Sequence, residues 1–107
     1  DLPLILPALP SAENRSAWHL FPVQIDVQRC AHDRLQVFEA LRSRGVGVNV
    51  HYIPVHTQPY YLQLGFDWGQ FPVAEQYYRQ ALSLPLYPGL SDAQQDQVVQ
   101  ALQEVLS

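Results

Sequence analysis

The stretch that decides the fold spans residues 41–61 and reads LRSRGVGVNVHYIPVHTQPYY. It opens on the end of a helix, because Gly45 follows a basic turn and supplies the left-handed residue with which many helices close. Apolar and other residues alternate over 46–53, which predicts a strand. Pro54 ends that strand, and the remainder predicts a rigid loop rich in His, Tyr and Pro.

Strand and helix patterns alternate on both sides of this stretch. Before it, Phe21, Val23, Ile25 and Val27 occupy every second position, which predicts a strand over residues 18–27. Pro22 would place this strand at a sheet edge or at a bulge, since proline lacks a backbone donor. The other predicted elements are a helix over 32–44, the strand over 46–53, a helical turn over 60–64, a helix over 71–82, an extended piece over 83–87 and a helix over 91–106.

The predicted helices carry recognisable start signals and apolar faces. Ser91 and Gln94 have the spacing of a capping box, and Pro72 suits the first turn of a helix. Strands and amphipathic helices in this order predict an α+β domain with a short, mostly antiparallel sheet and about three helices. Residues 1–17, interrupted by three prolines, are expected to form an extended lead-in or linker, and residues 18–107 the domain. The apolar face predicted for the helix over 71–82 consists of Val73, Ala74, Tyr77 and Ala81.

Composition narrows the range of functions. The chain has 107 residues, enough for one domain, and only 15% of them are charged. Its net charge is −4 and it has no basic stripe, which argues against nucleic acid or an anionic membrane surface as a partner. No apolar run approaches the length that spans a bilayer. The single cysteine, Cys30, excludes an internal disulfide and suggests a reducing compartment such as the cytoplasm.

Two residue types are missing altogether. All six basic residues are arginines, so the chain has no lysine to form a Schiff base. It also has no methionine and begins at Asp1, which suggests a processed product or an excised domain.

The densest group of potentially reactive side chains lies in residues 51–61. His51 and His56 are two possible metal ligands, but a zinc site needs three or four. Local hydrogen bonding that organises the loop is the simpler interpretation, and contact with a ligand or another domain is the alternative. Cys30 beside His32 is a weak pattern for a nucleophile and its base, because neighbours in sequence need not pair in space. The acidic residues, Glu75 among them, are interpreted as solvated positions or helix caps.

These motifs resemble a known family. The segments WHLFPV over 18–23, the run over 41–61, FPVAEQYY over 71–78 and ALSLPLYPGLS over 81–91 are similar to the C-terminal domain of DegT/StrS aminotransferases. The family comprises pyridoxal-phosphate-dependent (PLP-dependent) sugar aminotransferases of the aspartate-aminotransferase, or type I PLP, fold. The resemblance covers about residues 15–106. Within the family, the motifs over 51–61 and 71–78 look most similar to the transaminase of the pseudaminic acid pathway.

The resemblance implies a partner domain and a reaction. In the family a larger N-terminal domain carries the Schiff-base lysine and the other cofactor-binding residues, so this chain alone is expected to hold no PLP and to be inactive. The parent enzyme would be a cytoplasmic homodimer that transfers an amino group from glutamate to a 4-keto nucleotide sugar. The resemblance suggests His51, Tyr52 and His56, then Trp18 and His19, as the residues nearest the substrate cleft.

Two other functions remain open from the sequence. The chain could be a freestanding α+β module that binds a small ligand, which would require a closed surface and a real pocket. It could also be an enzyme whose metal or thiol chemistry uses His51, His56 and Cys30.

Overall fold

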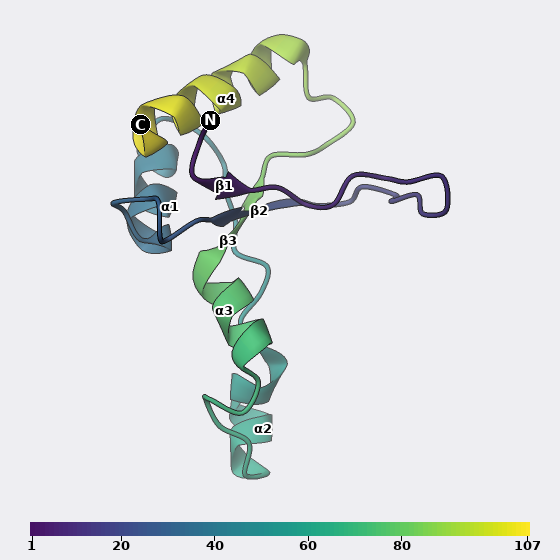
Figure 1. The fold of residues 1–107 in the computed structure, drawn as a ribbon, viewed down its shortest axis with the longest axis vertical. Coiled ribbons are helices and arrows are strands. Elements are labelled where there is room, and N and C mark those ends of the chain that lie inside the picture. The colour runs from purple at the N-terminus through teal and green to yellow at the C-terminus, as the bar shows by residue number, and fades with distance from the viewer.

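Three short antiparallel strands form the centre of the fold (Figure 1). A computed structural model describes residues 1–107. The order in the sheet is β1-β2-β3, and Leu82 on β3 lies opposite Val23 on β2. The strands and helices are β1 (Leu4–Ile5), β2 (Phe21–Ile25), α1 (Arg34–Ser43), the single 3-10 turn η1 (Val55–Thr57), α2 (Pro59–Gln63), α3 (Pro72–Gln80), β3 (Ala81–Leu84) and α4 (Asp92–Leu106). The predicted α+β class with a short antiparallel sheet is confirmed.

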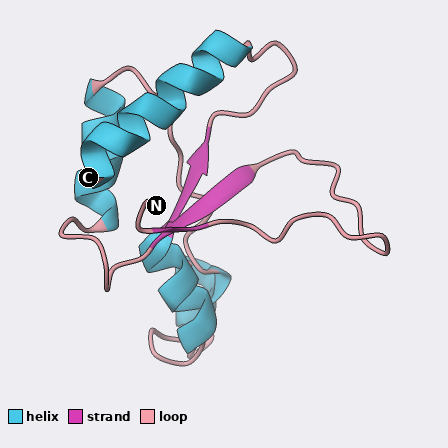
Figure 2. Ribbon diagram, turned by 45° about the horizontal axis from the view of Figure 1, so that its top comes forward, coloured by secondary structure: helices cyan, strands magenta, loops and turns pink.

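Helices α1 and α4 lie together against the sheet, whereas α3 and α2 extend from its other end (Figures 1 and 2). Side chains from α1, α4, β2, β3 and the segment after α1 meet in one cluster of eleven buried apolar residues, here called the core. Burial of this apolar surface is the main force that stabilises the domain. The core consists of Val23, Ile25, Val37, Leu41, Val46, Val48, Leu82, Ala101, Leu102, Val105 and Leu106.

The helices of the core begin where their local signals predict. At α4 the backbone N–H of Gln94 donates to Ser91 Oγ at 3.3 Å and the N–H of Ser91 donates to Gln94 Oε1 at 2.9 Å, which confirms the capping box. Asp33 and Gln36 make the same reciprocal pair at α1. After α1, Gly45 has φ +78°, the left-handed conformation expected of it. None of the helices has the length and apolarity that crossing a membrane requires.

The predicted strand over 46–53 is wrong as a strand. Val46 and Val48 are buried, as the alternation predicts, but the segment pairs with the sheet only where Asn49 and Ser83 exchange two backbone hydrogen bonds of 3.1 and 2.8 Å. An alternating pattern therefore indicates which side chains face the core. It does not guarantee that the backbone forms a continuous ladder of hydrogen bonds with a neighbouring strand. The lead-in over residues 1–17, in contrast, contains a strand that was not predicted. Leu4–Ile5 forms β1 and pairs with β2.

Two further expectations are corrected. Strand β2 lies in the middle of the sheet and not at an edge, yet Pro22 is accommodated because the two-residue β1 reaches only Gln24 and Ile25. Helix α3 ends at Gln80, so Ala81 and Leu82 belong to β3. Of the apolar face predicted for this helix, only Ala81, which belongs to β3, is buried, whereas Val73 is 83% exposed. The buried residues of α3 itself are Glu75 and Gln80.

Residues 51–80, here called the arm, include η1, α2 and α3. In Figure 1 the arm runs away from the sheet on the side opposite α4. All ten residues from 61 to 70 are exposed, and most of the large aromatic side chains of the arm face solvent. The arm therefore depends on contacts other than a hydrophobic core.

Candidate functional site

The arm is organised around one buried carboxylate, that of Glu75 on α3. Only 3% of this residue is exposed. Its Oε1 accepts hydrogen bonds from the backbone N–H of Gly69 at 2.7 Å and of Phe71 at 3.3 Å, and lies 2.9 Å from His56 Nε2. Arg79, one turn further along α3, places its guanidinium 3.7 Å from Oε2. One side chain thus joins η1, the loop before α3 and α3 itself.

These contacts lower the pKa of Glu75. Burial by itself acts in the opposite direction, because it disfavours the charged carboxylate. The hydrogen bond with His56, the backbone N–H groups of Gly69 and Phe71 and the charge of His56 together outweigh burial, so the pKa lies below its ordinary value. Glu75 is therefore ionised at neutral pH.

The ionised carboxylate fixes how His56 is protonated on the ring nitrogen that it contacts. A carboxylate is only an acceptor, so the 2.9 Å contact requires a proton on His56 Nε2. The imidazole is also packed among aromatic rings, with its centroid 4.7 Å from that of Phe71 and 6.3 Å from that of Trp68. His56 is 8% exposed, so the contacts with Glu75, Phe71 and Trp68 together restrict the orientation of its ring.

His51 and Tyr52 occupy the start of the same loop. His51 is half-buried and its Nδ1 lies 2.9 Å from Ser83 Oγ on β3, which ties the loop to the sheet. The peptide bond between His51 and Tyr52 is cis. Tyr52 is 67% exposed, so its ring is presented to the surface.

An apolar groove lies between this loop and the first turns of α3. Its volume is about 770 Å³. One wall is the loop from Tyr52 to Val55, and the other is formed by Phe71, Val73 and Tyr77 with their neighbours. Of the residues suggested from the sequence, Tyr52 lines this groove, whereas His51 and His56 fasten the loop that forms its wall.

Trp18 and His19 are not joined to this group by any hydrogen bond. The ring of Trp18 packs against that of Phe21 at 5.5 Å between centroids, and its backbone N–H donates to Ser16 Oγ. Trp18 has φ +40°, and His19 is exposed at the entry to β2. Their place in a substrate cleft therefore stays a prediction.

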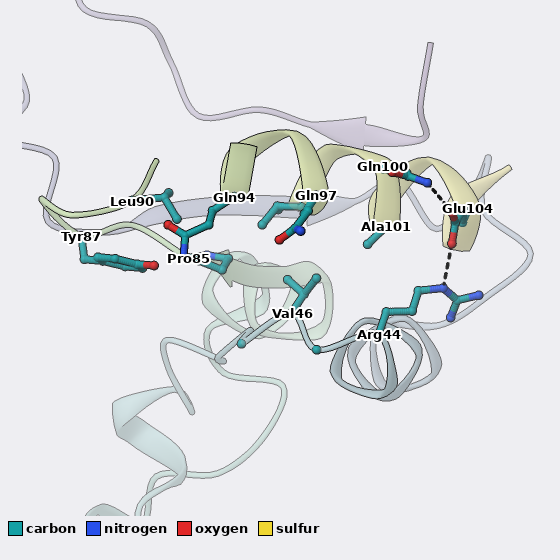
Figure 3. A pocket seen from close by; sticks show the side chains of 13 residues that line it. Arg44, Val46, Pro85, Tyr87, Leu90, Gln94, Gln97, Gln100, Ala101 and Glu104 are labelled. Carbon is teal, nitrogen blue, oxygen red and sulfur yellow. Dashed lines mark hydrogen bonds and ion pairs between the residues drawn. The ribbon is translucent and has the colours of Figure 1, made fainter. Parts of the chain in front are cut away.

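A second hollow of about 810 Å³ lies on the other side of the molecule, between α4, the segment after α1 and the segment after β3 (Figure 3). Its walls are mixed, with Gln94, Gln97 and Gln100 on α4 beside apolar side chains such as Val46 and Leu90. Glu104 closes one end through its contact with Arg44 Nε at 3.3 Å. No group of charged side chains converges on it, and we assign it no chemistry.

The chain gathers neither a metal site nor the parts of a PLP site. No three His, Cys, Asp or Glu side chains lie close enough together to hold a metal ion, and His51, His56 and Cys30 are not brought together. The chemistry of PLP requires an amine for its Schiff base, and the basic side chains here are all arginines. The lysine that forms the Schiff base with PLP is therefore not among these 107 residues.

Comparison with known proteins identifies the fold and the family. Residues 1–103 match the model of the DegT/DnrJ/EryC1/StrS aminotransferase family. The chain belongs to this family. It is 37% identical to the spore coat polysaccharide biosynthesis protein SpsC of Bacillus subtilis (strain 168), covering 99% of this chain and 28% of SpsC.

Solved structures of family members superpose on the domain. DesV of S. venezuelae, in complex with a ketimine intermediate, has a TM-score of 0.81 and 33% identity, over 94% of this chain and 26% of DesV. PseC of Helicobacter pylori, an aminotransferase of pseudaminic acid biosynthesis, has a TM-score of 0.72 and 25% identity, over 82% of this chain and 23% of PseC. The fold is that of the small domain of type I PLP aminotransferases, and the chain spans about a quarter of the length of these relatives.

Glu75 is the residue of the site that the sequence did not reveal. It was expected at a solvated or capping position, but it is buried. One signal was present, because Glu75 follows Pro72 in the first turn of α3, where a carboxylate suits the N–H groups of the helix start. Nothing in the sequence pairs it with His56, which is 19 residues away.

Proposed function

We propose that this chain works as the small domain of a PLP-dependent nucleotide-sugar aminotransferase, in which it forms one wall of the substrate cleft. The observation that carries this proposal is the combination of a family match over residues 1–103 with a length about a quarter of that of the relatives. A large domain outside these residues would carry PLP and the lysine that binds it. The absence of lysine from this chain supports that division.

The contribution of the small domain would be shape and contacts. Tyr52, held outward by a loop that His51 and His56 fasten, would line the cleft together with the groove of α3. Trp18 and His19 are proposed as further cleft residues. Residues 18–107 are proposed as the body of the small domain, and residues 1–17 as the segment that leads into it from the large domain and adds β1 to its sheet.

The reaction follows from the family. The full enzyme would transfer an amino group from glutamate to a 4-keto nucleotide sugar, as a homodimer in the cytoplasm. The narrower proposal, the transaminase of the pseudaminic acid pathway, rests on the motifs over 51–61 and 71–78. Keto nucleotide sugars outside the pseudaminic acid pathway belong in the same assay, because DesV has a higher TM-score and identity to this chain than PseC.

The test is a titration of the protein with PLP. Binding is measured by the visible absorbance of the protein-bound cofactor. The 107 residues alone should show no saturable complex. A mixture with the large domain should bind PLP and transfer an amino group from glutamate to a keto nucleotide sugar. A saturable complex of PLP with the 107 residues alone would contradict the proposal and favour a freestanding module that uses the apolar groove.

A further inference from the structure

We propose that Glu75 is a positioning residue, which holds His56 and through it the loop from Tyr52 to Val55 in the one shape that the substrate cleft requires. This inference rests on the proposed function, since it assigns the loop to the cleft of an aminotransferase.

Both walls of the apolar groove are attached to the same carboxylate, that of Glu75. The wall on α3 is attached directly, because Glu75 is part of that helix and also accepts the N–H of Phe71 at 3.3 Å. The wall formed by the loop is attached through His56, whose Nε2 lies 2.9 Å from Oε1. The distance between the two walls therefore depends on this pair.

The turn η1 connects His56 to the exposed end of the loop. Thr57, its neighbour in η1, donates its backbone N–H at 3.0 Å and its hydroxyl at 2.7 Å to the carbonyl oxygen of Pro54. Pro54 is buried and has a restricted φ. A fixed His56 thus fixes Pro54, and Tyr52 and Ile53 directly before it.

The imidazole ring of His56 is held by its hydrogen bond to Glu75. Oε1 of Glu75 already accepts two backbone N–H groups, and His56 completes the set with its Nε2 proton. His56 Nδ1 makes no hydrogen bond within the chain and is not sealed from solvent. Arg79 is the only other charged group in contact with Glu75, and it lies on α3, so it adds no link to the loop. Glu75 is therefore the hydrogen-bond partner that determines the tautomer of His56, and together with the packing of Phe71 and Trp68 it sets the direction of the ring.

The experiment uses the full-length protein with Glu75→Gln, which keeps the size of the side chain and removes its charge. Its matched control is Glu104→Gln, which changes an exposed carboxylate far from the arm. Glu75→Gln should raise KM for the keto nucleotide sugar about tenfold and leave kcat within about twofold, since it disturbs binding and not the cofactor. His56→Gln should have the same effect, and the double variant should be no worse than either single one.

A role in folding alone would give a different result, namely a lower Tm and a smaller active fraction with KM unchanged. That result, or a KM equal to that of the Glu104→Gln control, would overturn the proposal. A second measurement is independent of activity: nitrogen NMR of labelled histidine, at a pH at which the imidazole is neutral, should find His56 in the single tautomer protonated on Nε2. Glu75→Leu, which removes the acceptor altogether, should give a mixture of tautomers. A mixture already in the wild-type protein would overturn the pairing.

The two measurements also separate this inference from the proposed function. Wild-type protein that transfers an amino group to no nucleotide sugar would contradict the proposed function, and with it the assignment of the loop to a sugar cleft. The tautomer of His56 would still decide whether Glu75 positions the ring.

Discussion

The core and the arm of this small domain are stabilised by different kinds of contact. In the core, eleven apolar side chains from distant parts of the chain exclude water from one another. In the arm, the buried residues apart from Pro54 are polar or charged, namely His56, Thr57, Glu75 and Gln80. The arm's apolar side chains are instead largely exposed, including Tyr60, Leu64, Phe66, Trp68, Phe71 and Val73.

This difference indicates which region keeps the domain folded and which region meets something else. Contiguous exposed apolar surface on a small protein usually marks a place where another surface binds. A polar network can hold such a region in a defined shape without a hydrophobic core, because its hydrogen bonds are directional. Substitutions in the core should therefore destabilise the domain far more than substitutions in the arm.

Leu82→Ala should destabilise the whole domain. Leu82 is fully buried at the centre of β3, and removal of such a side chain costs about 2–5 kcal/mol in the free energy of unfolding. The control is Val73→Ala in the exposed face of the arm, with an expected change below about 0.5 kcal/mol. Urea denaturation measures both, and equal losses would mean that the arm is part of the same core.

Acid should loosen the arm before the core. The folded-state pKa of Glu75 is lowered, so its contribution to stability is fully present above the pKa of an unfolded glutamate, about 4.3. That contribution is lost as the pH falls through the lower folded-state pKa. Amide exchange of Gly69 and Phe71, whose N–H groups Glu75 accepts, should accelerate in this range relative to the core. Glu75→Gln should remove the pH dependence, and its persistence in that variant would assign the effect to another group.

Ser91→Ala should weaken the start of α4 by about 1 kcal/mol, since it removes the side chain that accepts the N–H of Gln94. Ser11→Ala, in the exposed lead-in, is the matched control. Thermal unfolding followed by circular dichroism measures the difference. No difference between the two variants would show that α4 is held by its packing against the core alone.

Glu104→Gln should have the smallest effect. The ion pair between Arg44 and Glu104 has both side chains at least 40% exposed, and such pairs contribute less than about 1 kcal/mol. Any loss should shrink further in 1 M NaCl, because salt screens exposed charges. A large loss that salt does not reduce would mean that this ion pair, at one end of the hollow beside α4, contributes more to stability than its exposure suggests.

The local signals of the sequence were sufficient for the helices. The capping box of Ser91 and Gln94, the left-handed Gly45 and the short helix after Pro59 all agree with the structure. In each case the partners lie within a few residues of one another, so the sequence contains the whole interaction. The motifs also identified the family, because several of them occur in the order that its members share.

Partners that are distant in sequence were decided by the tertiary structure alone. The alternation over 46–53 predicted the burial of Val46 and Val48 but not the exposure of Tyr52. The pairing is limited to Asn49 and Ser83, and the lead-in supplies β1. The acidic residue of FPVAEQYY gave no indication that it would be buried against His56. Sequence periodicity specifies which face of an element is apolar, whereas the burial and ionisation of Glu75 depend on which segments the folded chain brings around it.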